Sequence, residues 1–258
     1  MILRERQNRI MSALRTDGAA SVRDLAAALA VSESTIRRDL EILDRNGELT
    51  RTYGGAVLSP GATVEDHGAT AEEGAFDDAR DIDLKWRMAR AAAAMVADGS
   101  VVILDIGTTT PLVARQLRGR DITVITSNLA VFDELRDDEA VRLVLLGGVV
   151  RRNYRTLVGS LAELALSQVS ADIVFLSCTG VRANGHVVDN MAVEAPIKQS
   201  MIAASDRVVL LASEAKFPGS GALRLCSLTD VDALVTTSGA PDETLALCRN
   251  AGGEVTVV

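Results

Sequence analysis

Hydrophobic positions near the start of the chain recur with a helical period. Apolar residues at positions 2, 3, 10, 11 and 14 predict an amphipathic helix that ends before Asp17 and Gly18. A second helix is expected from Ser21, a good N-cap residue, with Asp24 placed to complete a capping box. A third follows through "STIRRDLEILDRNG", with one stripe of apolar residues and Gly47 as its stop. The first 47 residues therefore predict three short helices.

Two β-prone runs surround Gly54 and Gly55 in "ELTRTYGGAVL" and predict a small hairpin. Three short helices followed by a hairpin are the element order of a winged helix-turn-helix, which we assign to residues 1–58. Residues 59–84 are rich in Pro, Gly, Ala and acids with few large apolar residues, which predicts a linker.

From residue 85 onward, short Val/Ile/Leu runs alternate with helical segments. The runs "VVILDI", "TVIT", "RLVLLGG", "IVFLSCTG", "RVVLLAS", "ALVTT" and "EVTVV" predict strands. Nearly continuous apolar strands that alternate with helices indicate a mostly parallel sheet covered on both faces. The predicted fold class is α/β, with an N-terminal winged helix-turn-helix and a C-terminal domain over residues 85–258.

Composition excludes several classes of protein. The chain has 258 residues, 48% hydrophobic, and no run near the ~18 apolar residues of a membrane span. The first residues lack the apolar centre of a signal peptide, so a cytoplasmic protein without membrane association is expected. Cys178, Cys226 and Cys248 are predicted to be reduced and mostly buried. Neither His67 nor His186 has zinc-site spacing to these cysteines, so neither a metal nor a cofactor is expected.

Charge is distributed unevenly along the chain, whose formal net charge is −8. Residues 1–58 hold nine arginines and eight acids, a net charge of +1, which leaves −9 for the remainder. The acidic remainder would be repelled by a polyanion, whereas the N-terminal part can approach one.

The third predicted helix carries the candidate DNA-binding residues. In a helix-turn-helix, the second helix of the unit enters the major groove with its N-terminal residues leading. Small hydroxyls suit phosphates, and arginine suits a phosphate or a guanine edge. The alternative is a solvated helix face whose arginines pair with neighbouring acids. In the hairpin, Arg51 and Tyr53 lie where a wing would reach the DNA backbone, although Tyr53 could equally be a packing residue. The predicted DNA-binding residues are Ser32, Ser34, Thr35, Arg37, Arg38, Arg51 and Tyr53.

The segment 6–58, with "VSESTIRRDLEIL" and "RTYGGA", resembles the DNA-binding domain of the DeoR (deoxyribose operon repressor) family of bacterial regulators. The resemblance continues through "LDIGTTT", "ITSNLAV", "LLGGVV" and "LLASEAKF". It implies a transcriptional regulator, usually a repressor, with a C-terminal sugar-phosphate sensor of the ribose-5-phosphate-isomerase-like fold.

Three successive predicted strands end in small or polar residues, where ligands of open α/β sheets bind. In "LDIGTTT", the hydroxyls and the free N–H groups of the next helix can surround an anion. The alternatives are an N-cap that serves only the helix and, for the aspartate, a structural acid. The candidate effector-binding residues at these strand ends are Asp105, Gly107, Thr108, Thr109, Thr110, Thr126, Ser127, Asn128, Gly147 and Gly148.

The resemblance adds Lys198 and Lys216 as phosphate or hydroxyl partners, although from the residues alone both lysines are expected on the surface. It also marks "SCTGVRANGHVVDN", with Asp189, as a pocket loop. The chain departs from the family pattern where Ser213 and Thr237 replace acids, with Glu214 as a partial substitute. The identity of the sugar therefore stays open.

The predicted function is a DNA-binding transcriptional regulator, controlled by a phosphorylated sugar and assembled as a homodimer or homotetramer. One rival is a sugar-phosphate isomerase or deaminase, but the sequence shows no histidine-based acid/base pair and no carboxylate dyad. The other rival is a DNA-binding protein whose second domain only oligomerises.

Overall fold

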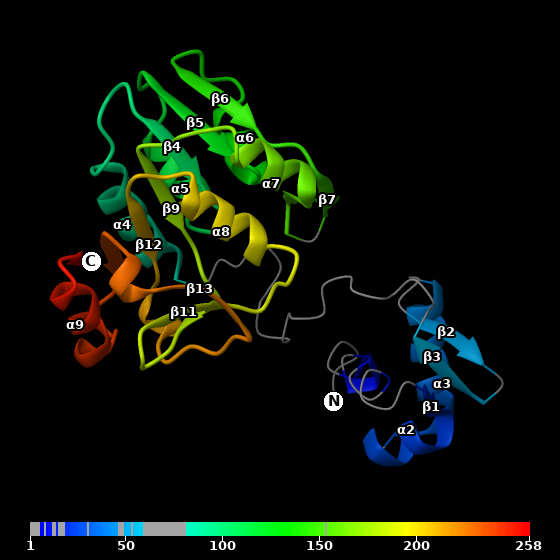
Figure 1. Cartoon of the computed structure of the whole chain (residues 1–258). Helices are drawn as coiled ribbons and strands as arrows, with labels where there is room; N and C mark the ends of the chain where they lie inside the picture. The colour runs from blue at the N-terminus through cyan, green and yellow to red at the C-terminus, as the bar shows by residue number, and fades with distance from the viewer. Residues whose placement is uncertain are drawn as a thin grey trace. The chain divides into compact units, whose positions relative to one another are not determined.

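The computed structural model describes residues 6, 7, 9–11, 14, 19–29, 31–45, 49–52, 54–58, 81–152 and 154–258. The chain divides into two compact units, Met1–Glu73 and Gly74–Val258 (Figure 1). The helix stop at Gly47, the wing residue Tyr53 and linker residues 59–80 lie outside the described residues. The domain boundaries expected at residues 58 and 85 stay predictions.

The first unit contains the predicted helices and hairpin. Residues 6, 7, 9–11 and 14 are helical and are followed by α2 (Val22–Leu29) and α3 (Glu33–Arg45). The hairpin is formed by β2 (Leu49–Thr52) and β3 (Gly55–Leu58). The predicted apolar stripe of α3 is buried against the first helical residues and α2, in a core that includes Ile10, Leu14, Leu25, Ile36, Leu40 and Leu43.

A strand that the sequence analysis missed, β1 (Ala19–Ser21), pairs antiparallel with β3 and completes a three-stranded sheet. The two backbones lie so close that a Cβ on Gly55 would stand 2.2 Å from the carbonyl oxygen of Ala20. Only glycine fits this position. The Oγ of Ser21 accepts a hydrogen bond from the Asp24 N–H (3.0 Å), which confirms the predicted cap of α2.

The second unit is built on a seven-stranded sheet whose neighbouring strands are all parallel. In chain order the strands are β4 (Val101–Leu104), β5 (Ile122–Thr126), β6 (Val141–Leu145), β9 (Ile173–Leu176), β12 (Val208–Leu211), β14 (Ala233–Thr236) and β15 (Glu254–Val257). Their order across the sheet is β15-β14-β12-β9-β4-β5-β6. The chain therefore winds in opposite directions on either side of the β9–β4 pair, where such sheets form a crevice at their carboxyl ends.

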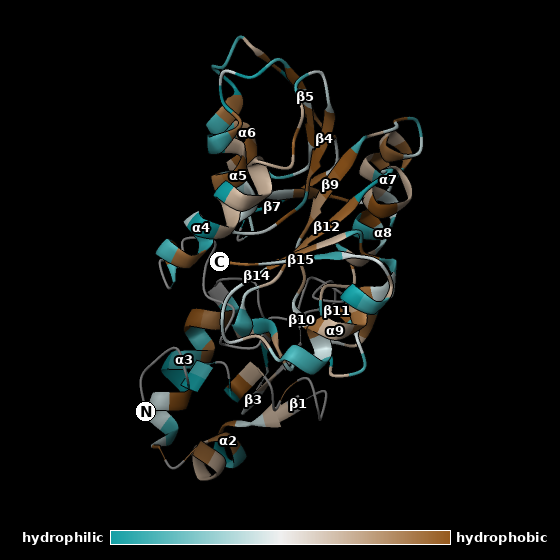
Figure 2. Cartoon of the chain, turned by 90° about the vertical axis from the view of Figure 1, so that its left-hand side faces the viewer, coloured by the Kyte–Doolittle hydropathy of each residue, from teal (hydrophilic) through white to brown (hydrophobic). Residues whose placement is uncertain are grey.

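Helices cover both faces of this sheet, as predicted (Figure 1). One face packs α4 (Ile82–Ala93), α5 (Thr110–Gln116) and α6 (Leu129–Leu135) against Val102, Leu104 and Phe175. The other packs α7 (Ser160–Leu166), α8 (Ala195–Ala203) and α9 (Asp242–Asn250) against Ile103, Val174 and Leu176. Because successive side chains of a strand point to opposite faces, a continuous apolar run supplies both cores. The central strands are accordingly hydrophobic throughout (Figure 2).

Five short strands outside the central sheet were not predicted. A ribbon joins β7 (Val149–Arg151) to β8 (Thr156–Val158), and a three-stranded antiparallel sheet joins β10 (Gly180–Val181), β11 (His186–Asp189) and β13 (Leu223–Ser227). Unlike the central strands, none of them is a continuous Val/Ile/Leu run flanked by helices, so long-range pairing decides them. Within the described part of the chain, no helix has the length and apolar character needed to cross a membrane.

Candidate functional site

The N-terminal end of α3 presents the small hydroxyl residues predicted to meet DNA. Ser32 precedes the helix, and its Oγ accepts a hydrogen bond from the Thr35 N–H (3.2 Å). The same Oγ lies 2.8 Å from the hydroxyls of Ser34 and Thr35. Ser32 and Ser34 are exposed and Thr35 is half-buried. Ser32 therefore caps the helix and holds a group of hydroxyls at its tip.

Arg37 and Arg38 are both exposed on α3. Arg37 pairs with Glu33 one turn earlier (2.7 Å), whereas Arg38 makes no ion pair with any described residue. The alternative partner Asp39 is buried and pairs instead with Arg6, which ties the first helical residues to α3. Both arginines therefore face solvent, but Arg37 is paired with a neighbouring acid of its own helix, and only Arg38 has no acidic partner among the described residues.

On the wing, Arg51 is exposed, and its backbone N–H donates to the Asp44 carboxylate (3.2 Å). Tyr53 is outside the described residues, so its contact with DNA stays a prediction.

In the second unit, the candidate site at the β4–β9 switch point begins with Asp105, the residue directly after β4. Its carboxylate is fully buried and accepts hydrogen bonds from the backbone N–H (2.9 Å) and the hydroxyl (2.8 Å) of Ser177, directly after β9. Gly107 has φ +149°, and a Cβ there would lie 3.0 Å from the Ser177 Oγ. The chain can turn beneath this contact only because residue 107 has no side chain.

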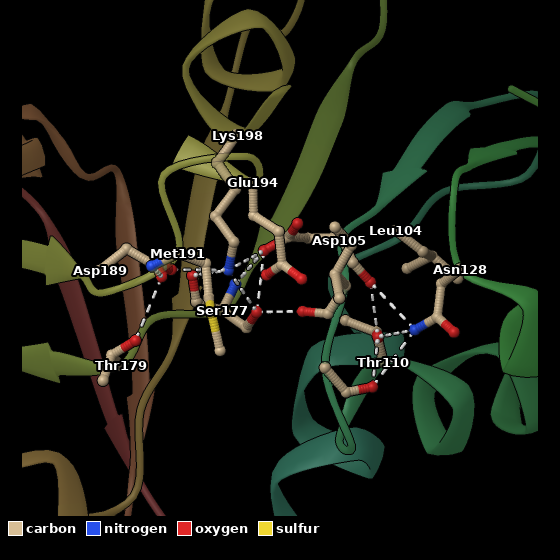
Figure 3. A network of polar contacts seen from close by, with 12 residues as sticks. Leu104, Asp105, Thr110, Asn128, Ser177, Thr179, Asp189, Met191, Glu194 and Lys198 are labelled. Carbon is tan, nitrogen blue, oxygen red and sulfur yellow. Dashed lines mark hydrogen bonds and ion pairs between the residues drawn. The ribbon is translucent and has the colours of Figure 1, made fainter. Parts of the chain in front are cut away.

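Lys198, from α8, is the centre of a buried charged cluster at this site (Figure 3). Its Nζ lies 3.1 Å from carboxylate oxygens of both Asp105 and Asp189, and it donates to the carbonyl oxygen and the Oγ of Ser177. The expectation from the residues alone that Lys198 is a surface residue is wrong, because its side chain is only 3% exposed. Two carboxylates provide the charge that makes its burial tolerable.

Glu194, just before α8, adds a third carboxylate to the cluster and pairs with Arg151 at the end of β7. The cluster thus holds two cations and three carboxylates. Burial raises the pKa of Glu194 to about 7, an effect that the charges of Lys198 and Arg151 only partly offset. Burial opposes the charge on Lys198 as well, but Asp105, Asp189 and Glu194 outweigh it and raise the pKa of its ammonium.

The loop between β4 and α5 carries three threonines whose hydroxyls differ in their partners. Thr110 is buried, and its Oγ1 donates to the carbonyl oxygen of Asp105 (2.7 Å). Thr108 and Thr109 are half-buried, and their hydroxyls bond to no described residue. Thr109 occupies the N-cap position of α5 without making a side-chain cap. These two hydroxyls are therefore free to meet a ligand.

After β5, Thr126 and Asn128 hold the loops together. Thr126 Oγ1 donates to the Leu104 carbonyl (2.7 Å) and accepts from the Asn128 N–H (3.0 Å). The Asn128 side chain donates to the carbonyl of Gly107 (3.2 Å) and caps α6 through the Ala130 N–H (2.9 Å). Both side chains are buried. Their geometry favours a supporting role over direct ligand contact.

Four buried side-chain oxygens in this unit have no hydrogen-bond partner among the described residues. Each lies at or just beyond the carboxyl end of a different parallel strand, β4, β5, β12 or β14. Buried polar groups in native proteins are nearly always paired. The oxygens on β4 and β5 belong to neighbouring strands, whereas those on β12 and β14 lie on the other side of β9. The oxygens are Asp105 Oδ1, Ser127 Oγ, Glu214 Oε2 and Thr236 Oγ1.

The other predicted positions also follow the carboxyl ends of strands. Gly147 and Gly148 follow β6, and Lys216 lies half-buried in the short 3-10 helix η1 (Glu214–Lys216) after β12. The Lys216 ammonium makes no ion pair with the described residues. Where the family's acids are replaced, the Thr237 Oγ1 accepts a hydrogen bond from the Glu214 N–H (2.8 Å). Ser213 is the N-cap residue of η1.

Sequence reasoning missed Ser177, Glu194 and Arg151. Ser177 directly follows an apolar strand, the same signal that identified Asp105 and Ser127. The pairing of Glu194 with Arg151 had no local signal, because 43 residues separate them.

A winged helix-turn-helix with exposed arginines, joined to an α/β domain with a buried polar cluster at the carboxyl ends of its strands, is typical of a DNA-binding regulator with a separate sensor domain. Family models agree: a DeoR-like helix-turn-helix domain matches residues 6–60, and the DeoR C terminal sensor domain matches residues 80–238. The chain belongs to the DeoR family of transcriptional regulators and is not an enzyme.

Similar proteins match along nearly their whole length. The uncharacterized HTH-type transcriptional regulator YulB of Bacillus subtilis (strain 168) is 31% identical over 258 residues, covering 100% of this chain and 98% of that protein. The glycerol-3-phosphate regulon repressor of Haemophilus influenzae is 31% identical, with coverages of 90% and 88%. The L-fucose operon activator of the same species is 28% identical, with coverages of 95% and 96%.

Among solved structures, ribose 5-phosphate isomerase A from Methanocaldococcus jannaschii matches with a TM-score of 0.39 and 20% identity, covering 52% of this chain and 53% of that one. The full-length sorbitol operon regulator SorC from Klebsiella pneumoniae matches with a TM-score of 0.36 and 11% identity, covering 95% and 98%.

Proposed function

We propose that this protein is a cytoplasmic repressor of a carbohydrate-metabolism operon, released from its operator when a phosphorylated sugar binds the second unit. A small polyol phosphate is consistent with the similarity to the glycerol-3-phosphate regulon repressor of Haemophilus influenzae. Two copies bound to a symmetric operator would supply the two recognition helices.

The observation that carries this proposal is the pair of unpartnered buried oxygens, Asp105 Oδ1 and Ser127 Oγ, at the carboxyl ends of the neighbouring strands β4 and β5. A sugar offers several hydroxyls, each able to donate and accept a hydrogen bond. The Asp105 oxygen can accept from such a hydroxyl, and that of Ser127 can donate or accept.

The phosphate requires a different position at the carboxyl ends of the strands. The Lys198 cluster holds more carboxylates than cations and would repel it, and the Lys198 ammonium already faces four oxygens. We place the phosphate at the free hydroxyls of Thr108 and Thr109, with Lys216 as its counter-charge. In this arrangement Lys198 orients Asp105 for the sugar and does not bind the phosphate itself.

The test is operator release titrated with candidate sugar phosphates, in wild type and Thr109→Glu. A carboxylate at residue 109 would occupy or repel the phosphate position, so the variant should lose its response while its effector-free DNA affinity stays unchanged. Thr229→Glu is the matched control. Thr229 is an exposed threonine just before β14, at the amino ends of the strands and away from the proposed site. A Thr109→Glu protein that responds like wild type would place the phosphate elsewhere.

The rival in which the second unit only oligomerises makes a different prediction. Sugar phosphates at millimolar concentration would then leave the melting temperature unchanged. A ligand that binds only the folded state raises it, by mass action.

A further inference from the structure

The ribbon of β7 and β8 is a separate element beside the central sheet. Its two strands pair antiparallel with each other, and neither is a strand of the seven-stranded sheet. A glycine with positive φ lies at each end of the ribbon: Gly148 (φ +153°) directly precedes β7, and Gly159 (φ +105°) directly follows β8. A few residues at the ends of an element that absorb changes in φ and ψ can act as its hinges. The ribbon therefore has the ends that a moving element needs.

The strand β8 bonds the ribbon to the end of β5. Thr156 is fully buried, and its Oγ1 donates a hydrogen bond to the carbonyl oxygen of Ser127 (3.1 Å). The N–H of the next residue, Leu157, donates to the same oxygen (2.9 Å). Ser127 is also the residue whose buried hydroxyl has no partner among the described residues and is proposed to contact the sugar. One strand of the ribbon is thus bonded directly to a candidate ligand residue.

The strand β7 ties the ribbon to the charged cluster through Arg151. Its guanidinium pairs with the carboxylate of Glu194, and the two side chains are only 10% and 6% exposed. The same guanidinium lies over the ring of Tyr154, in the turn of the ribbon, 4.2 Å from the ring centroid. The charge of Glu194 acts on Lys198, whose pKa it helps to raise, and Lys198 pairs with Asp105. The other strand of the ribbon is thus connected to the second candidate ligand residue.

The two connections meet at one place in the ribbon. Arg151 and Thr156 are directly opposite each other in the register of β7 and β8. A ligand that bonds to both Asp105 and Ser127 therefore acts on both members of a single cross-strand pair. Coupling between two sites is carried by ion pairs, hydrogen bonds and rigid elements that have two arrangements. The ribbon has the bonds and the position for this task.

We propose that the β7–β8 ribbon couples effector binding to operator release and that Arg151 is the positioning residue of this coupling. The inference rests on the proposed function, because it names the element through which that same site regulates DNA binding. Ligand bonded at the ends of β4 and β5 displaces the ribbon. Its outer side exposes Val149 and Val150, by 71% and 50%, so the displacement changes a surface of the second unit. Coupling of this kind requires that the ligand bind the two ribbon positions with different affinity.

The test measures ligand binding and operator release separately in the full-length protein. The probes are glycerol 3-phosphate, glucose 6-phosphate and ribose 5-phosphate. Thermal unfolding reports their binding, and fluorescence anisotropy of labelled operator DNA reports release. Arg151→Met should keep the wild-type rise in melting temperature, because the groups proposed to contact the ligand remain, but should need at least tenfold more probe for half-release. Arg152→Met is the matched control, because Arg152 is the next residue and is exposed, and it should release operator as wild type does.

A second variant covers the case in which Arg151→Met does not fold. Arg151→Lys keeps the positive charge beside Glu194 and should raise the probe concentration for half-release by a smaller factor. An Arg151→Met protein that releases operator like wild type would overturn the coupling. So would one that loses probe binding and release together, because Arg151 would then only build the site. If no probe changed the melting temperature or the operator binding of wild type, the proposed function itself would fail, and the coupling with it.

Discussion

The Nζ atom of Lys198 lies 3.1 Å from a carboxylate oxygen of Asp105, and both side chains are buried. The two residues come from α8 and from the end of β4, so their contact joins the helix to the point where the sheet reverses its winding. One oxygen of Asp105 is held by Lys198 and Ser177, and the other has no partner among the described residues. A carboxylate fixed on one side and free on the other is suited to a hydroxyl-bearing ligand.

Lys198→Met should therefore be strongly destabilising. It leaves Asp105 and Asp189 buried without their cation, and breaking a buried pair in this way costs about 3–5 kcal/mol. Lys216→Met is the control and should change the free energy of unfolding by less than about 0.5 kcal/mol, because Lys216 makes no ion pair in the described part of the chain. Urea unfolding measures both. Equal losses of unfolding free energy in the two variants would contradict the stabilising role of the Lys198 ion pairs.

Glu194 should make stability depend on pH near neutrality. Its pKa is raised from 4.5 to about 7 in the folded protein, so the folded state binds this proton more tightly than the unfolded state does. The stabilisation is present at low pH and is lost as pH rises between these two values. Glu194→Gln should flatten the fall in melting temperature between pH 5 and about 7. It also removes the partner of Arg151, so the slope with pH, and not the absolute stability, is the measurement. An unchanged slope would refute the raised pKa.

Ser127 and Thr126 offer a matched pair of neighbouring hydroxyls. Ser127→Ala removes an oxygen with no described partner, so it should leave stability nearly unchanged and weaken sugar-phosphate binding about tenfold. Thr126→Val removes an oxygen bonded to Leu104 and Asn128 and should cost about 1–3 kcal/mol of stability. Calorimetric titration and thermal unfolding separate the two effects. If Ser127→Ala lowered stability and Thr126→Val weakened binding, Thr126 would be the ligand contact and Ser127 the structural residue.

Arg37→Ala and Arg38→Ala should weaken operator binding, by about 1–3 kcal/mol for a residue that reads a guanine. Folding should be unaffected, because the exposed Glu33–Arg37 pair contributes little to stability. Arg249→Ala removes an exposed arginine from α9 in the other unit and should leave operator affinity unchanged. Fluorescence anisotropy at fixed salt is the measurement. If both α3 variants bound the operator with wild-type affinity, α3 would not be the recognition helix.

The sequence by itself determined the elements and their class. The stripe Ile36–Leu40–Leu43 required a helix with one buried face, and that left Arg37 and Arg38 exposed. The apolar strand runs required a parallel sheet covered on both faces, because side chains on both sides of each strand are apolar. Asp105 and Ser127 were predicted at the sheet edge because each follows such a run. These are local patterns, because side chains return to the same face about every 3.6 residues in a helix and every two residues in a strand.

Only the tertiary structure decided which of these residues have partners. Thr110, Thr126 and Asn128 look as available as Thr108 and Ser127 in the sequence, but their polar groups are used to join one loop to the next. From its own helix Lys198 looks like a surface lysine. In the structure it is buried, because it pairs with carboxylates that lie 93 and 9 residues away along the chain. The strand β1 and the Arg151–Glu194 pair likewise have no local pattern. Hydrogen bonds and ion pairs between distant segments depend on how the chain is folded, so the period of one element contains no information about them.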